Sequence, residues 1–220
     1  MDSKNDKKEE KKEKNIVKIG KNPDFTLEAK DGVVCIEKNI LAKCASKVLG
    51  IPEFQKNKDE ESIPLKTHSV DTIHTVLRIA LLCDFQKEFG FSNNDIEYVK
   101  EFTYKEDFEC ADFAHKYDIE DVMKFLDIDM SRTREYTAEG IRLLLLYIGT
   151  YNRNNLIDEI FDRYIRLKNS DIREAEKVTF EDFNRCLNNF DPNNKLGRNK
   201  FISRVIQAMC SSEKINVKKK

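Results

Sequence analysis

Histidine and cysteine are the residue types in this sequence best suited to metal or nucleophilic chemistry. There are three histidines, and His115 follows Cys110 in a C-x4-H arrangement with no second ligand pair nearby. A zinc site needs four converging ligands, so a structural role for His115 is the favoured interpretation. His74 falls on or beside the apolar face of an expected helix, where a packed histidine is favoured over a catalytic one. We therefore predict no metal and no cofactor.

The six cysteines form no CxxC pair, and most lie inside apolar stretches. In such places a free cysteine behaves as a small hydrophobic residue, so we expect buried, reduced thiols in a cytoplasmic or nuclear protein. A distant Cys–His nucleophile pair stays open from sequence alone. The cysteines are Cys35, Cys44, Cys83, Cys110, Cys186 and Cys210.

Other catalytic and nucleic-acid signatures are missing from the sequence. No GxSxG, GxGxxG or GxxxxGK[ST] motif occurs, and we predict that the chain is not an enzyme. The net charge is −1, which provides no strong field for nucleic acid or an anionic membrane. A modest basic patch near the last helix is interpreted as a solvated helix face rather than a nucleic-acid site. It consists of Lys195, Arg198, Lys200 and Arg204.

The ends of the chain are expected to be tails. Residues 1–15 are almost all charged and predict a disordered leader, with a nuclear import signal as the alternative. Residues 212–220 predict a basic tail. The longest apolar run, 141–148, is too short to span a bilayer, so we expect no membrane contact.

The first half of the chain combines strand and helix patterns. Residues 25–29 alternate apolar and polar side chains, and Asp31-Gly32 before the apolar run 33–36 predicts a hairpin whose turn residues adopt positive φ. Residues 40–49 then have helical spacing with an interruption near Ala45-Ser46, and 62–65 predicts a short strand. Ser69 is expected to cap a long helix.

The second half reads as helix. Thr103 with Glu106 predicts a capping box, Asp118 is expected to cap the next helix, and residues 86–102 are expected to be a loop with a short strand or helical turn. From Thr137 onward apolar stripes predict helices only. The predicted organisation is α+β, with a mixed domain over 16–130, a boundary within 131–136 and a helical extension over 131–211.

The order of these elements resembles the BTB/POZ fold, a small sheet flanked by helices. Five segments carry the resemblance: 23–27 (PDFTL), 31–36 (DGVVCI), 38–42 (KNILA), 63–65 (IPL) and 111–119 (ADFAHKYDI). In the last segment, Tyr117 is similar to a Tyr that bridges the two closing helices in members of that family. Departures occur at Glu37, where the family often has His, and at 45–48, which lacks the usual Pro and aromatic residue.

The resemblance implies protein–protein binding, homodimerisation or higher self-association, and in many members docking onto cullin-3 as a ubiquitin-ligase substrate adaptor. The implied dimer surface includes Asp24, Ile36, Glu37 and Leu41, although Ile36 and Leu41 are equally well explained as core residues. The implied cullin-facing loop reads Phe54, Gln55, Lys56, Asn57 and Lys58, without the Glu of the family's hydrophobic-x-Glu motif. That departure favours the alternative, a scaffold or nuclear regulatory protein that uses the fold without cullin binding.

Overall fold

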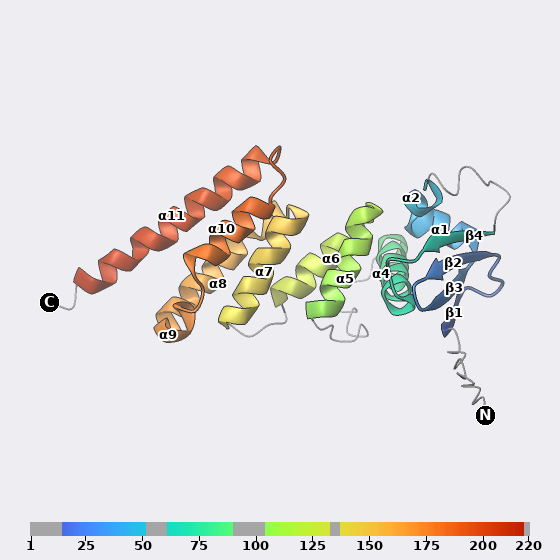
Figure 1. Cartoon of the computed structure of the whole chain (residues 1–220), viewed down its shortest axis with the longest axis horizontal. Coiled ribbons are helices and arrows are strands. Elements are labelled where there is room, and N and C mark those ends of the chain that lie inside the picture. Colours follow the sequence, from blue (N-terminus) through green and yellow to red (C-terminus); the bar gives the residue numbers. More distant parts are fainter. Residues whose placement is uncertain (1–14, 52–60, 90–103, 133–136, 218–220) are drawn as a thin grey trace, which may run out of the picture. The chain divides into compact units, whose positions relative to one another are not determined.

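The computed structural model describes residues 15–51, 61–89, 104–132 and 137–217 (Figure 1). The fold is α+β, with a small mixed sheet followed by helices, as the sequence predicts. Contacts between Cα atoms divide the chain into two compact units, Met1–Ser92 and Asn93–Lys220. Each unit is therefore described separately.

The first unit is built on a four-stranded sheet with the order β1-β3-β2-β4. Its strands are β1 (Asn15–Ile19), β2 (Phe25–Ala29), β3 (Gly32–Ile36) and β4 (Ser62–Leu65). β2 and β3 form an antiparallel hairpin, which confirms the predicted one, while β1 pairs parallel with β3 and β4 parallel with β2. The edge strand β1 occupies a segment that the sequence marks only as briefly apolar.

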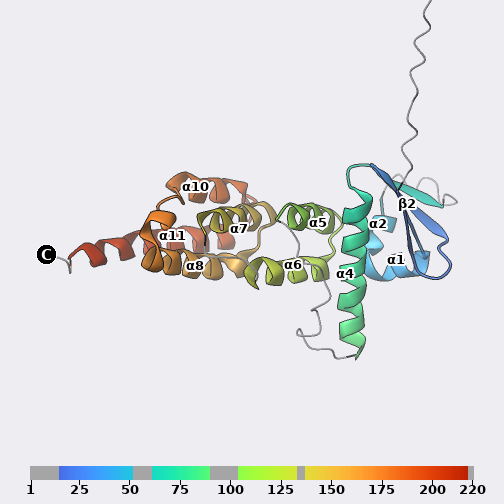
Figure 2. The same cartoon turned by 90° about the horizontal axis from the view of Figure 1, so that it is seen from below.

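One face of this sheet is buried by helices. Alternate residues of β2 and β3 are buried, as period-2 patterning requires of a half-buried sheet. The helices of this unit are α1 (Lys38–Cys44), α2 (Ser46–Leu49) and α4 (Val70–Phe89), and α4 contacts β1, β3 and α1 (Figure 2). Ser69 accepts a hydrogen bond from the Thr72 amide at 3.1 Å, so the predicted start of the long helix is confirmed.

The physical reason given above for Asp31-Gly32 was wrong. Among the described residues, positive φ occurs only at Gly20, Asp118 and Asn152, so the Asp31-Gly32 turn does not use left-handed backbone. A Cβ on Gly32 would instead lie 2.0 Å from the backbone oxygen of Asn15. Glycine is needed here because β1 passes directly over this position.

Asp31 has a different role from the predicted one. Its carboxylate accepts a hydrogen bond from the amide of Val70 at 2.8 Å, at the first residue of α4. A carboxylate at this position satisfies an open amide and suits the positive end of the helix dipole. The hairpin loop therefore also holds the start of the long helix.

The second unit contains helices only within its described residues. They are α5 (Tyr104–Lys116), α6 (Glu120–Arg132), α7 (Ala138–Tyr151), the 3-10 turn η2 (Asn154–Leu156), α8 (Ile157–Ser170), α9 (Ile172–Ala175), α10 (Phe180–Asn189) and α11 (Lys195–Val217). Figure 1 shows α7, α8, α10 and α11 side by side, with α11 running on past α10.

Local capping signals account for several helix ends. The Thr137 hydroxyl accepts from the amide of Gly140, and Thr179 forms a capping box with Asp182. Asp118 differs from its expected role, because it adopts a left-handed φ of 53° between α5 and α6. The expected cap at Thr103 lies outside the described residues.

Aromatic packing joins α5 to α7. The Phe108 ring lies 5.9 Å from Tyr147, and the His115 ring lies 5.6 Å from Tyr151, measured between ring centroids. These contacts explain why α5 and α6 group with the later helices, whereas the sequence placed them with the sheet and put the boundary within 131–136. The expected tail also differs, since α11 continues to Val217.

The close approach of β1 to Gly32 predicts a sharp difference between two glycines. Replacing Gly32 with Ala should displace β1 and cost about 1–3 kcal/mol of stability, the usual range for overpacking. At Gly50 an added Cβ would lie 3.4 Å from the Lys47 oxygen, which is ordinary contact, so Gly50→Ala is the matched control. Urea unfolding and amide hydrogen exchange in β1 and β3 measure the effect. Equal stability of the two variants would contradict it.

Candidate functional site

The residues of the predicted dimer surface gather at the end of the hairpin farthest from its turn. Ile36 and Leu41 are 0% exposed, which matches their alternative interpretation as core residues. Asp24 accepts a hydrogen bond from the Lys38 amide at 2.7 Å, and Glu37 accepts one from the Lys21 amide at 2.6 Å. Only Asp24 and Glu37 therefore offer surface to a partner there, and self-association through this end stays a prediction.

The predicted cullin-facing loop lies outside the described residues. Its five positions are Phe54, Gln55, Lys56, Asn57 and Lys58. The role assigned to this loop stays a prediction.

The histidines and cysteines are not gathered into one site. Within the described part of the chain, no group of three or more His, Cys, Asp or Glu residues is placed to hold a metal ion. Burial raises the pKa of Cys110 to about 12, assisted by the charge of Asp107, and burial also raises the pKa of Cys186. Burial lowers the pKa of His74, with Arg78 adding to the effect. At neutral pH the two buried cysteines are therefore protonated thiols.

Three of the four residues of the basic patch have partners within the second unit, whereas Lys195 is exposed. Lys200 lies 2.8 Å from Asp158, and Arg204 lies 2.7 Å from Asp162. The hydrogen bond from Lys200 lowers the pKa of Asp158. Arg198 donates to the carbonyl of Leu187 at 2.9 Å, near the end of α10. These basic side chains hold α11 against α8 and α10.

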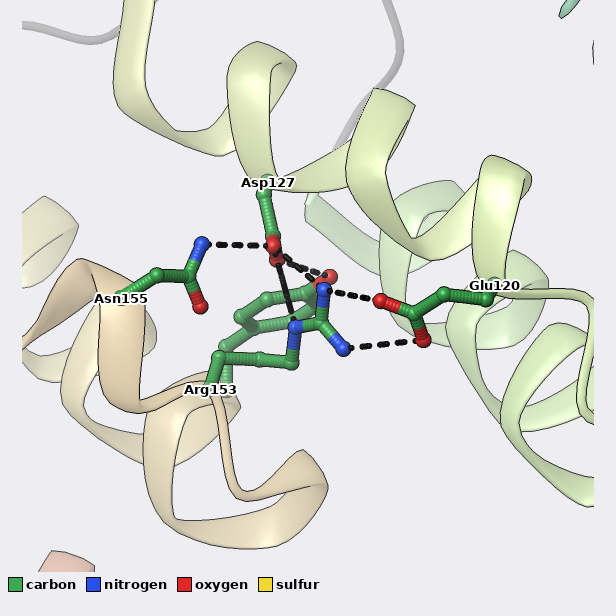
Figure 3. A network of polar contacts seen from close by, with 5 residues as sticks. Glu120, Asp127, Arg153 and Asn155 are labelled. Carbon is green, nitrogen blue, oxygen red and sulfur yellow. Dashed lines mark hydrogen bonds and ion pairs between the residues drawn. The ribbon is translucent and has the colours of Figure 1, made fainter. Parts of the chain in front are cut away.

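A polar network that the sequence analysis missed lies between α6 and the α7–η2 junction (Figure 3). Arg153 donates to Asp127 at 2.6 Å and to Glu120 at 3.2 Å. Asn155 and Tyr147 also donate to Asp127, at 2.9 and 3.2 Å. Asp127 is only 4% exposed, so three donor side chains converge on one nearly buried carboxylate.

The electrostatics of this network favour a charged pair and a neutral tyrosine. Burial opposes the charge on Arg153, but hydrogen bonds from its guanidinium to Asp127 and Glu120 outweigh burial and raise its pKa. Burial raises the pKa of Tyr147, and the charge of Asp127 raises it further. A neutral phenol and a permanently charged guanidinium can donate hydrogen bonds but cannot accept a proton at neutral pH. The arrangement therefore serves to join helices.

No residue spacing indicates this network in advance. Asn152 ends α7 with a left-handed φ of 56°, and this turn directs Arg153 back toward α6. The partners lie more than twenty residues apart along the chain. The only local signal is Asn152 after an apolar helix, which marks a helix end. It does not indicate which residue Arg153 contacts.

A half-open cavity of about 460 Å³ lies between α8, α10 and α11. Val178, Phe183 and Ala208 are buried in it, whereas Phe180 and Met209 at its edge are 63% and 52% exposed. The cavity is lined by Tyr164, Lys168, Glu176, Val178, Thr179, Phe180, Phe183, Val205, Ala208 and Met209.

The apolar stripe of α11 is wider than the face that it buries. Phe201 and Ala208 are buried, but Ile202 and Ile206 are 40% and 57% exposed. Helical spacing in the sequence places Phe201, Ile202, Val205, Ile206 and Met209 on a single stripe. The structure divides that stripe into a buried half and an exposed half. Together with Phe180, the exposed half is called the α11 apolar face, with the members Phe180, Ile202, Ile206 and Met209.

The network around Asp127 predicts a large stability effect. Asp127→Ala would leave Arg153 half-buried without its main acceptor and should cost about 3–5 kcal/mol, as for other broken buried pairs. Lys105→Ala is the control, because Lys105 pairs with Glu109 at 3.9 Å and its side chain is 85% exposed, and exposed pairs contribute about 0–1 kcal/mol. Denaturant unfolding measures both variants, and similar losses would rule out a supporting role for the network.

Burial predicts which thiols react in the native protein. Cys110 and Cys186 should resist iodoacetamide at neutral pH, because the thiolate is the nucleophile and burial raises the pKa of both. Cys35, Cys44 and Cys83 are partly exposed and should react first. Mass spectrometry of peptides after timed alkylation checks this order, with urea-unfolded protein as the control. Labelling of Cys110 as fast as Cys35 would show that the site is open.

Comparison with known proteins identifies no relative of this chain. No family model, curated protein or solved structure matches it. Over the described residues, no helix is sufficiently long and apolar to cross a membrane.

Proposed function

We propose that this chain is a non-enzymatic protein–protein interaction module, with a BTB/POZ-like first unit and a helical second unit. The observation that carries the proposal is the α11 apolar face. Large apolar side chains exposed next to each other are costly in water, and such patches mark interaction surfaces. The order of hairpin, short helices, β4 and α4 in the first unit supports the BTB/POZ part of the proposal.

The charge distribution around this face gives further support. Charged residues make up 36% of the sequence. Between Asn199 and Met209 the only charged residues are Lys200 and Arg204, and both pair with acidic residues of α8. Depletion of charge and enrichment in Met and aromatic side chains are typical of interface centres.

The narrower proposal is an adaptor role on cullin-3. The alternative is a scaffold or nuclear regulator that binds other proteins without a cullin. The sequence of residues 54–58 favours the alternative, because it lacks the Glu that cullin-binding members carry. Direct binding of the purified chain to purified cullin-3 distinguishes the two.

The interaction role itself is tested by comparing variants in affinity purification with quantitative mass spectrometry. Phe180→Asp should lose a defined set of the proteins that wild type retains, because it places a charge in the α11 apolar face. Leu196→Asp is the matched control, since Leu196 is exposed outside that face. Identical recovery with both variants would contradict the proposal. Cullin-3 among the retained proteins, together with direct binding, would favour the adaptor role.

A further inference from the structure

The exposed residues of α11 follow the spacing of a coiled-coil seam. Asn199, Ile202, Ile206 and Met209 are separated by three, four and three residues. This is the a/d pattern of a heptad, in which every member faces a partner helix. All four are exposed, and Met209 also lines the cavity between α8, α10 and α11.

The composition of this seam favours pairing with the same seam on a second copy of the chain. Between Asn199 and Ile206, Ser203 and Val205 flank it, and neither is charged. Two copies meeting across a two-fold axis place the same patch opposite itself, which any like charge at the centre would oppose. Between Asn199 and Met209 the seam carries no charged member and meets this condition.

Charge also decides the direction of pairing. Lys195 lies on the same seam, seven residues before Ile202, and is exposed. A parallel pair would set Lys195 against its own copy, whereas an antiparallel pair separates the two ammonium groups and aligns the helix dipoles favourably. In the antiparallel register, Ile202 faces Ile206 of the second copy and Met209 faces Asn199 of the second copy.

The area available predicts the strength of pairing. Taking roughly 200 Å² for a large side chain, Ile202, Ile206 and Met209 expose on the order of 300 Å² per copy, given exposures of 40–57%. Pairing would therefore remove about 600 Å² of apolar side-chain surface, below the roughly 1,200–2,000 Å² of stable interfaces. An apolar area of this size is expected of a weak, reversible dimer.

We infer that α11 pairs antiparallel with α11 of a second copy of this chain through Ile202, Ile206 and Met209. This inference rests on the proposed interaction function and names its partner. Ile202, Ile206 and Met209 are 40%, 57% and 52% exposed, so the seam is accessible to a second helix.

Sedimentation equilibrium of the full chain from low micromolar to hundreds of micromolar tests the inference. Wild type should show a reversible monomer–dimer equilibrium. Ile206→Lys should weaken it at least tenfold, because the ammonium group would be buried without a partner. Leu196→Lys adds the same charge at an exposed position of α11 outside the seam and should leave the equilibrium unchanged. Circular dichroism confirms that both variants fold.

Cysteine cross-linking tests the direction of pairing in a Cys210→Ser background. An oxidised mixture of Ile202→Cys and Ile206→Cys chains should form mixed dimers faster than either variant alone forms its own. A parallel pair would show the opposite preference and overturn the antiparallel register.

The outcomes separate this inference from the proposed function. If Ile206→Lys dimerises like wild type, or if wild type stays monomeric throughout, pairing through α11 is overturned. The interaction role would still be judged by the loss of partners from Phe180→Asp. If that variant loses none while wild type dimerises through α11, binding of other proteins fails and self-association stands.

Discussion

The buried contact between Arg153 and Asp127 is the constraint on which the arrangement of the second unit depends. A carboxylate with 4% exposure requires a partner, and Arg153 reaches it only because the chain turns at Asn152. That turn also places Asn155 of η2 within hydrogen-bond distance of Asp127 in α6. α8 then presents Asp158 and Asp162, which pair with Lys200 and Arg204 and fix the rotation of α11 about its axis. The outward direction of Ile202 and Ile206 therefore follows from a contact several helices earlier.

Short-range signals were sufficient to predict much of the fold. The hairpin, the break near Ala45-Ser46, the strand at 62–65 and the cap at Ser69 all depend on neighbours within a few residues. The positive φ predicted for Asp31-Gly32 was wrong because the glycine there is required by a long-range contact. Its glycine is required by β1, which pairs with β3 from an earlier segment, and no turn rule includes that strand.

The candidate site could not be predicted because it depends on which face of each helix packs against the rest of the unit. Helical spacing correctly placed Ile202, Ile206 and Met209 on an apolar stripe. The spacing does not show which residues of a stripe the neighbouring helices bury. The same limit applies to Ile36 and Leu41, which belong to a patterned segment and are fully buried. Ion pairs such as Arg204 with Asp162 join residues far apart in sequence, so the basic patch appeared solvated.

The two surfaces considered for self-association differ in what they can contribute. At the hairpin end, Ile36 and Leu41 are buried, and Asp24 and Glu37 already accept backbone hydrogen bonds that hold the neighbouring turns. A dimer there would need polar side chains to serve two roles, or strands to rearrange. The α11 seam exposes 40–57% of Ile202, Ile206 and Met209, so its pairing gains apolar burial without displacing a backbone hydrogen bond. On this physical ground the helical unit is the better source of self-association.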